Sequence, residues 1–319
     1  MYKRILFLVG ALCLHAQDTV IRSTTQLILV PATVTDLHGK TLDGITEPEF
    51  EVLDNGRLVK HSLETTNQPI ALVVAIQTSG ISGPAVAKIQ KIGAMFEPLV
   101  VGEGGLAAIL TYSDEVKVWQ EFTHNADDFT KRMRKILPDG NAARMNDAVV
   151  TAAQMFADYP AYRRVLVVIG ESRDRGSQVK LQDAITKAQA ANVTIYPVNY
   201  SVYKTSFTSR GDERFEGTGR RVYDPGGGLD LLAVFAEIGR LATQNSGDAL
   251  AKYTGGEKVS FAKLSGLEKV IAKVGDDLHT QYLLSFQAEN TGSGIYHTIT
   301  VRVKRADAVV RARPGYWRD

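Results

Sequence analysis

Between residues 69 and about 275, short apolar runs alternate with longer amphipathic stretches. The runs that are almost continuously apolar over the length of a strand are 70–76, 106–112, 165–169 and 193–198. Strands of this kind are typical of parallel sheets that are covered on both faces. The intervening and following stretches have helical spacing, which predicts helices over 84–95, 126–136, 146–157, 180–191, 229–241 and 264–278. This alternation predicts a doubly wound, mostly parallel α/β sheet of Rossmann-like type.

The two ends of the chain follow a different pattern, with a period of two. Residues 18–66 and the segment from residue 280 onward alternate apolar and polar positions between turn signals. Neither end is large enough to bury a good core alone. We therefore expect segments 17–67 and 279–319 to pack together as a small β-sandwich-like domain, with the α/β domain of residues 68–278 inserted between them.

Residues 1–16 have the layout of a secretory signal peptide. Lys3 and Arg4 precede an apolar run, and Ala16 offers a small residue for cleavage. This run is too short to span a bilayer, and no later segment is long and apolar enough to do so. The only cysteine, Cys13, lies inside the run. The preceding residue, Leu12, is too bulky for a usual lipoprotein signal. The mature chain is expected to be exported, to the periplasm, the cell surface or the medium, without disulfides.

Composition and charge narrow the classes of function. The 319 residues are 44% hydrophobic and 23% charged, which is typical of a folded globular protein. The net charge of +2 gives no broad attraction to nucleic acid, so no nucleic-acid partner is expected. The histidines are scattered, without a pair at the spacing of metal ligands. Glycine-rich stretches such as 102–105 lack the spacing of phosphate-binding loops.

Several segments, in this order and spacing, resemble those of a known family. They are "VTDLHGKTLDGITEPEFEVLDNGRLVKHSLE", "IQTSGIS", "YTGGEKV", "HTQYLLSF" and "VVRARPGYW". Together they resemble a von Willebrand factor type A domain with flanking β segments, and specifically the exported bacterial group often called acidobacterial. The resemblance covers nearly the whole mature chain. It implies a metal-ion-dependent adhesion site at the carboxyl edge of the sheet, where an Asp-x-Ser-x-Ser turn, a Thr and an Asp hold Mg²⁺ or Mn²⁺.

This sequence departs from that pattern at most of the ligand positions. Gln77 stands at the leading Asp position, Ser79 retains the first Ser, and Ile81 replaces the second Ser. Ala143 falls at the Thr position, and Glu171 lengthens the last Asp by a methylene. Mg²⁺ gives up its water reluctantly and binds through carboxylates and hydroxyls that are mostly missing here. The resemblance therefore implies a degenerate site, and we expect no tightly bound cofactor.

A weaker metal site stays open as an alternative. Glu171 and Asp174 could attract a cation loosely, and a shift of the alignment by one residue would bring Asn141 or Ser82 to the site. Asp147 is a further candidate ligand. In this alternative the protein binds Mg²⁺ or Mn²⁺ at low affinity.

The longest stretch without a clear period, residues 200–228, is expected to leave the sheet at the same carboxyl edge. It is rich in aromatic and arginine side chains, which are favoured as anchors of protein interfaces. The candidate partner-binding residues are Tyr203, Phe207, Arg210, Arg214, Phe215, Arg220, Arg221 and Tyr223. The tripeptide "RGD" at 210–212 is too short to predict recognition by itself.

The sequence thus predicts an exported, non-enzymatic module of the protein-binding or adhesion type that uses the carboxyl edge of its sheet. One alternative is an adhesin that depends on Mg²⁺ or Mn²⁺ at a divergent site. Another is a structural component of the cell envelope. A hydrolase that uses Ser79 as nucleophile is a further alternative, but the serine lacks a G-x-S-x-G elbow and a histidine placed by the sequence as its base.

Overall fold

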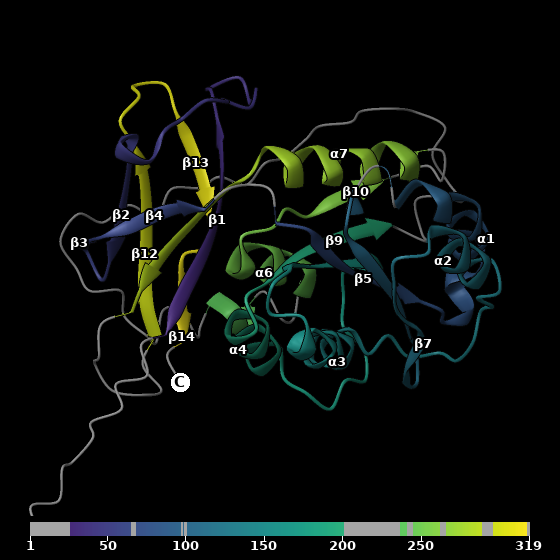
Figure 1. The fold of residues 1–319 in the computed structure, drawn as a ribbon. Coiled ribbons are helices and arrows are strands. Elements are labelled where there is room, and N and C mark those ends of the chain that lie inside the picture. Colours follow the sequence, from purple (N-terminus) through teal and green to yellow (C-terminus); the bar gives the residue numbers. More distant parts are fainter. Residues whose placement is uncertain are drawn as a thin grey trace, which may run out of the picture.

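A computed structural model describes residues 26–64, 68–96, 98, 101–200, 237–240, 245–261, 266–288 and 296–317. The predicted signal peptide, residues 1–16, lies outside the described residues, as does most of the predicted helix over 229–241. The described chain forms a β-sandwich unit beside an α/β unit (Figure 1). None of the helices in the described part of the chain combines the length and apolar character that a bilayer crossing requires.

The α/β unit is built on a six-stranded sheet with the order β10-β9-β8-β5-β6-β7. Neighbouring strands are parallel except β6 and β7, which are antiparallel. In this order the strands are Val259–Phe261, Val193–Tyr200, Arg163–Gly170, Ile70–Gln77, Leu106–Tyr112 and Val116–Thr123. Every residue of β5 and β6 is buried, because helices cover both faces. The mostly parallel sheet predicted from the apolar runs is confirmed.

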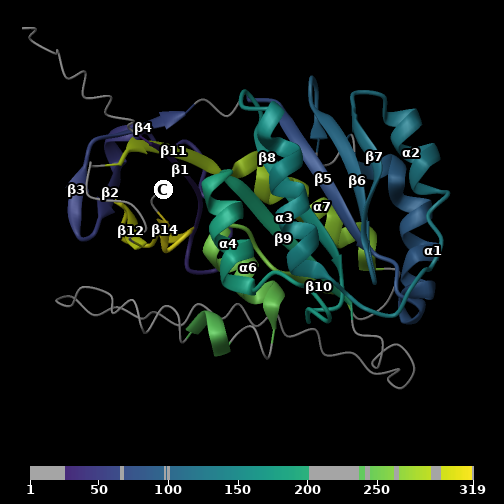
Figure 2. The same cartoon turned by 90° about the horizontal axis from the view of Figure 1, so that it is seen from below.

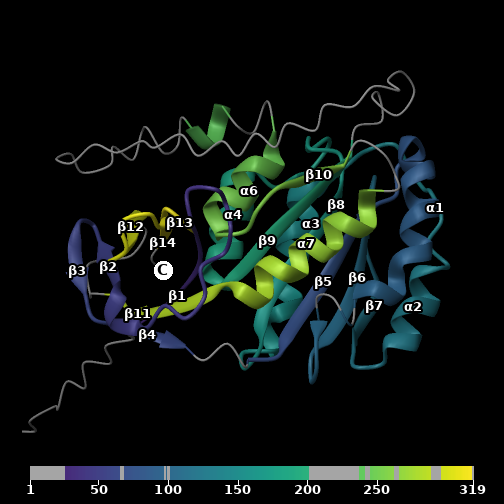
Figure 3. The ribbon, with the colours of Figure 1, turned by 90° about the horizontal axis from the view of Figure 1, so that it is seen from above.

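Helices cover the two faces of this sheet in two groups (Figures 2 and 3). One core contains α1, α2 and α7, which span Gly83–Ile92, Ala126–Met133 and Leu267–Thr280. The other contains α3, α4 and α6, which span Met145–Met155, Leu181–Ala190 and Ser246–Thr254. Short 3-10 helices lie at Glu47–Glu49, Gly80–Ser82, Gly93–Met95 and Phe156–Asp158.

The hydrophobic pattern does not reveal three of these elements. Strand β7 lies at the edge of the sheet and is half exposed, so polar residues interrupt its apolar positions. Strand β10 has three residues, and α6 is a short helix of nine residues. Asn146, the first residue of the helix predicted over 146–157, is of a type that often caps helices, but it does not cap α3. The N-cap is Arg144, and the side chain of Asn146, inside the first turn, donates to the carbonyl oxygen of Val179 instead.

The β-sandwich unit combines the two ends of the chain. One sheet has the order β13-β1-β11-β4, with strands Val309–Ala312, Leu27–Thr35, Tyr282–Gln287 and His61–Glu64. The other has the order β14-β12-β2-β3, with strands Gly315–Trp317, Tyr296–Val303, Phe50–Asp54 and Arg57–Val59. Strands β1 and β2 pair with β11 and β12, which follow the α/β unit in sequence. The inner faces share one core, which includes Val30, Val52, Leu284 and Ile299. The expected arrangement, an α/β domain inserted between paired β segments, is confirmed.

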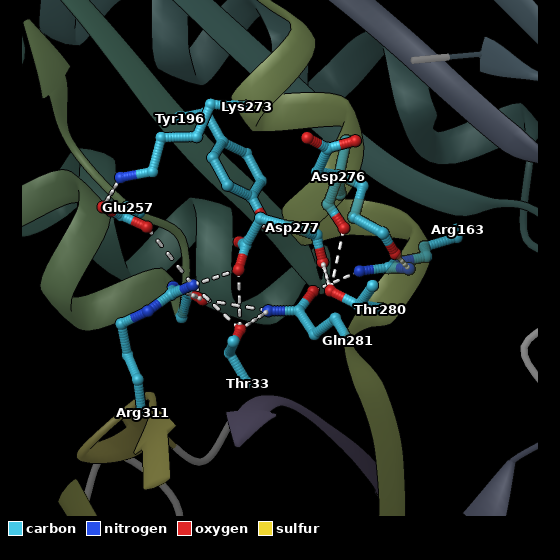
Figure 4. Close-up of polar contacts among 12 residues, drawn as sticks. Thr33, Arg163, Tyr196, Glu257, Lys273, Asp276, Asp277, Thr280, Gln281 and Arg311 are labelled. Atoms are coloured by element: carbon cyan, nitrogen blue, oxygen red, sulfur yellow. Dashed lines mark hydrogen bonds and ion pairs between the residues drawn. The ribbon is translucent and has the colours of Figure 1, made fainter. Parts of the chain in front are cut away.

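A polar cluster joins the two units where α7 leads into β11 (Figure 4). Its centre is Asp277, whose side chain is 8% exposed. This carboxylate accepts hydrogen bonds from Thr33 Oγ1 at 2.9 Å and from the Tyr196 hydroxyl at 2.7 Å. The guanidinium of Arg311 lies 2.5 Å away and also donates to Thr33 and to the carbonyl oxygen of Gly255. One buried acid thus connects α7, the central sheet and two strands of the sandwich.

Candidate functional site

The candidate site lies at the carboxyl edge of the six-stranded sheet, where β5 and β8 end. Gln77 is the last residue of β5, and the following turn contains Ser79 and the 3-10 helix Gly80–Ser82. Backbone hydrogen bonds tie this turn to the neighbouring loop, from Gly80 N to Gly140 O at 2.9 Å and from Asp139 N to Thr78 O at 2.6 Å. The backbone of this edge is therefore held in place before any partner arrives.

Gln77 connects this turn to the loop after β8. Its side chain is buried, with 1% of the residue exposed. Oε1 accepts the backbone N–H of Glu171 at 2.7 Å, while Nε2 donates to Ser79 Oγ at 2.7 Å and to Glu171 Oε2 at 3.1 Å. The backbone N–H of Glu171 can only donate, so it fixes which end of the amide is the oxygen. The N–H groups of Gln77 must then face the serine and the acid.

The Ser79 hydroxyl is fully buried and lies 3.1 Å from the Ser82 hydroxyl. Of the two serines, Ser79 stands at the position predicted to be retained, and Ser82 is brought to it by the short 3-10 helix. In the described chain, the hydrogen-bond partners of the Ser79 hydroxyl are Gln77 and Ser82, and no histidine contacts it. This geometry does not provide the base that a serine nucleophile needs.

Glu171 forms an ion pair with Arg175. Arg175 Nη2 lies 2.7 Å from Glu171 Oε2, and the two side chains are 46% and 19% exposed. The backbone of Arg175 exchanges two hydrogen bonds of 2.9 Å with Ala143, which is itself fully buried. Arg175 was not among the predicted site residues. An acid and a base four residues apart face each other predictably only on a helix, and this segment is a loop.

The remaining candidate ligands have other roles in the structure. Asp174 accepts the backbone N–H of Asn146 at 3.0 Å and the Ser177 hydroxyl at 2.6 Å. Asp147 accepts two backbone N–H groups of the loop after β8, at 2.9 and 3.1 Å. Asn141 is exposed, and its backbone N–H donates to Asp114. Ile81 lies in the 3-10 helix beside Ser79. Asp114, Asp147 and Asp174 therefore hold the loops of the edge together.

The residues present do not fit a bound Mg²⁺ or Mn²⁺. A hard cation needs oxygen lone pairs that converge on it. Here the amide N–H groups of Gln77 take lone pairs of Ser79 and Glu171, and Arg175 supplies the positive charge beside the acid. In the described residues, no group of three or more His, Cys, Asp or Glu side chains is arranged to hold a metal.

Two buried tyrosines, Tyr112 and Tyr200, lie next to this hydrogen-bond network and form its floor. The hydroxyl of Tyr112 donates to the carbonyl oxygen of Ile169, the residue before Gly170 at the end of β8. Burial raises the pKa of Tyr112 well above its usual range and that of Tyr200 to about 12. Both phenols are therefore neutral at physiological pH, and the floor adds no charge to the site.

Gly170→Ala is expected to lower the free energy of unfolding by about 1–3 kcal/mol, because it overfills a packed site. A Cβ at Gly170 would overlap the Tyr112 hydroxyl and lie 2.7 Å from Gln77 Oε1. Urea unfolding measures the loss. Gly83→Ala is the control at the same edge, since its Cβ meets nothing nearer than Pro138 Cγ at 3.8 Å. Equal stability of the Gly170 variant and the wild type would show that the floor is loosely packed.

A doubly wound sheet with helices on both faces and loops gathered at its carboxyl edge defines an α/β domain of Rossmann-like architecture. Residues 90–214 match the family profile of the von Willebrand factor type A domain. The chain therefore contains a von Willebrand factor type A domain, as the motifs around "IQTSGIS" implied. Membership of the exported acidobacterial group stays a prediction.

Solved structures of similar shape come from several sources. An aerotolerance-related membrane protein from Bacteroides fragilis NCTC 9343 is 13% identical, with a TM-score of 0.44, covering 65% of this chain and 98% of the other. BatB from Bacteroides thetaiotaomicron is also 13% identical, with a TM-score of 0.41, covering 66% and 98%. The SpRpn10 VWA domain is 13% identical, with a TM-score of 0.37, covering 65% and 93%. None of the curated proteins compared with the chain matches it.

The predicted partner-binding residues between 203 and 223 lie outside the described residues. Strand β9, from which this segment follows, ends at Tyr200 on the same edge as Gln77 and Glu171. The role of these aromatic and arginine side chains stays a prediction.

Proposed function

We propose that the protein is an exported, non-enzymatic binding module that recognises a protein partner at the carboxyl edge of its von Willebrand factor type A domain without a tightly bound cation. The observation that carries this proposal is the buried Gln77 amide, which donates to Ser79 and Glu171. The N–H donors of this amide occupy the space in which a cation would need oxygen ligands. The edge is thereby held together by its own side chains.

A rigid surface supports the binding role. The loops of this edge are tied to one another by backbone hydrogen bonds, and Arg175 is paired with Ala143 through its main chain. Binding to a surface that is already ordered avoids the entropy cost of ordering loops. Arg173 and Arg175 are exposed at this edge and are available to a partner. Arginine is enriched at the energetic centres of protein interfaces.

The proposal is tested by obstructing the edge with Arg173→Trp, which places a large side chain at an exposed position. An extract of cells that produce the protein naturally is passed over immobilised wild type and variants, in EDTA and in Mg²⁺. The retained protein is identified by mass spectrometry, purified and measured directly. We expect binding in EDTA, weakened at least about tenfold by Arg173→Trp, which corresponds to about 1.4 kcal/mol.

Glu103→Trp is the matched control, because Glu103 is exposed and precedes β6 at the opposite end of the sheet. It should bind as the wild type does. Binding that appears only in Mg²⁺ would favour the metal-dependent adhesin instead. Equal binding by Arg173→Trp would place the interface elsewhere on the molecule.

A further inference from the structure

We propose that Arg175 is a carboxylate-binding residue and that the partner of the carboxyl edge presents an acidic peptide segment to it. This inference rests on the proposed function and names the chemistry of its partner. The guanidinium stands at the rim of the edge with almost half of its side chain, 46%, exposed. A planar guanidinium offers its donors in a fork that matches the two oxygens of a carboxylate.

The first support is that Arg175 is held in place by its main chain, while most of its guanidinium donors have no partner among the residues that the structure describes. Its main chain is locked to Ala143 by two hydrogen bonds of 2.9 Å. Its guanidinium makes one hydrogen bond within the described residues, from Nη2 to Glu171 Oε2 at 2.7 Å. A guanidinium has five N–H donors. Among the described residues, Nη1 and Nε have no hydrogen-bond partner, so these donors can meet a carboxylate of a partner.

The second support is that Glu171 is anchored from behind. Gln77 donates to the same carboxylate oxygen, Oε2, at 3.1 Å and accepts the Glu171 backbone N–H at 2.7 Å. Gln77 is held in turn by Ser79, and Ser79 by Ser82. This chain of hydrogen bonds runs from the buried end of β5 to the exposed guanidinium. It holds Glu171 in place, and Glu171 positions the guanidinium of Arg175. A binding group must be supported in this way if it is to meet its ligand in the required geometry.

The third support is the distribution of charge around Arg175. The neighbouring carboxylates of Asp114 and Asp174 are occupied by donors of the loops themselves, from Asn141, Ala142, Asn146 and Ser177. Arg173 is exposed on the same loop. Arg144 follows Ala143 and is half buried, and within the described part of the chain its Nε has no hydrogen-bond partner. The acids of the edge thus hold its loops together, while Arg173 and Arg175 are exposed to solvent.

The probe is a fluorescein-labelled decaglutamate peptide, whose binding to the full chain is followed by fluorescence anisotropy at low salt. We expect saturable binding that Arg175→Gln weakens about tenfold or more, as expected for loss of a charged hydrogen-bond donor. Arg175→Lys keeps the charge but not the fork, and it should recover only a small part of the affinity. Arg302→Gln, at an exposed position on β12 of the β-sandwich unit, should bind as the wild type does.

Several results would overturn the inference. Equal binding by wild type and Arg175→Gln would show that other cations hold the peptide. Full recovery by Arg175→Lys would show that charge alone matters. Equal binding of a decameric oligothymidylate would show a general attraction for anions. If decaglutamate is not bound but the natural partner still binds this edge in EDTA, the inference fails while the proposed function stands. Melting temperatures of each variant confirm that the fold is intact.

Discussion

Arg311→Met is expected to lower the free energy of unfolding by about 3 kcal/mol at pH 7, since removal of one partner of a buried ion pair leaves a buried charge behind. Arg311 lies 2.5 Å from Asp277, whose side chain is 8% exposed. In the variant, Asp277 keeps its hydrogen bonds from Tyr196 and Thr33 but loses its paired counter-charge. Urea unfolding at pH 7 measures the loss.

The pH dependence of this loss has a defined sign. Burial, the largest influence, raises the pKa of Asp277, but the Arg311 charge and the hydrogen bonds from Tyr196, Arg311 and Thr33 outweigh it and hold the pKa below its ordinary value of 3.8. A depressed pKa stabilises the wild type above pH 3.8, and this contribution is lost as the pH falls through the folded-state pKa. Without Arg311, burial dominates and Asp277 protonates more readily. The difference between variant and wild type should therefore shrink from pH 7 toward pH 4.

Two further variants separate this effect from a general sensitivity to substitution. Arg302→Met replaces an exposed arginine on β12 and should change stability by less than about 0.5 kcal/mol. Asp277→Asn added to Arg311→Met removes the buried charge while an amide oxygen can still accept the Tyr196 hydroxyl, so it should recover about 1 kcal/mol or more. If Arg311→Met is as stable as Arg302→Met, the junction contributes nothing to the fold.

The second large effect is expected from Gln77→Asp, which should destabilise the protein by about 3 kcal/mol in EDTA. The substitution removes the amide that donates to Ser79 and Glu171, and it places a buried carboxylate next to the partly exposed carboxylate of Glu171. A divalent cation shared by the two carboxylates and the serine hydroxyls would relieve their repulsion. Mg²⁺ should therefore raise the melting temperature of the variant, by an amount that grows with its concentration.

The wild type and a neutral variant are the controls for this result. Calorimetric titration of the wild type with Mg²⁺ and Mn²⁺ should show no saturable binding. Gln77→Asn shortens the amide without adding charge, so it should cost less than Gln77→Asp and should not respond to Mg²⁺. Saturable stabilisation of the wild type by Mg²⁺ would contradict the view that Gln77 excludes a cation. A Gln77→Asp variant that is fully stable in EDTA would show that Glu171 is not confined beside it.

The sequence alone determined the class of the fold, because strand and helix periodicities are local properties of the chain. The apolar runs that became β5, β6, β8 and β9 are continuous, since each of these strands is buried on both faces. The pairing of the chain ends could also be inferred, because neither could bury a core alone. The register, such as Val52 opposite Val301, came only with the folded sandwich.

The candidate site was predictable in position but not in its contacts. The resemblance to the type A domain identified the turn of Gln77 and Ser79, and it placed Glu171 at the position of the last metal ligand. That Gln77 reaches Glu171, 94 residues further along the chain, follows from the parallel pairing of β5 and β8. The pairing of Arg175 with Ala143 is likewise a contact between loops. Loop contacts leave no periodic signal in a sequence.

The sequence by itself thus determined the elements, their layering and the loss of most metal-ligand residues at the carboxyl edge. Only the tertiary structure showed which contacts the residues at these positions make: the Gln77 amide donates to Ser79 and Glu171, and the Arg175 guanidinium pairs with Glu171. Only the tertiary structure placed Asp277 and Arg311 together between the two units. The physical reason is that periodicity records which face of an element is buried. Which polar atoms meet depends on how separate segments are brought together.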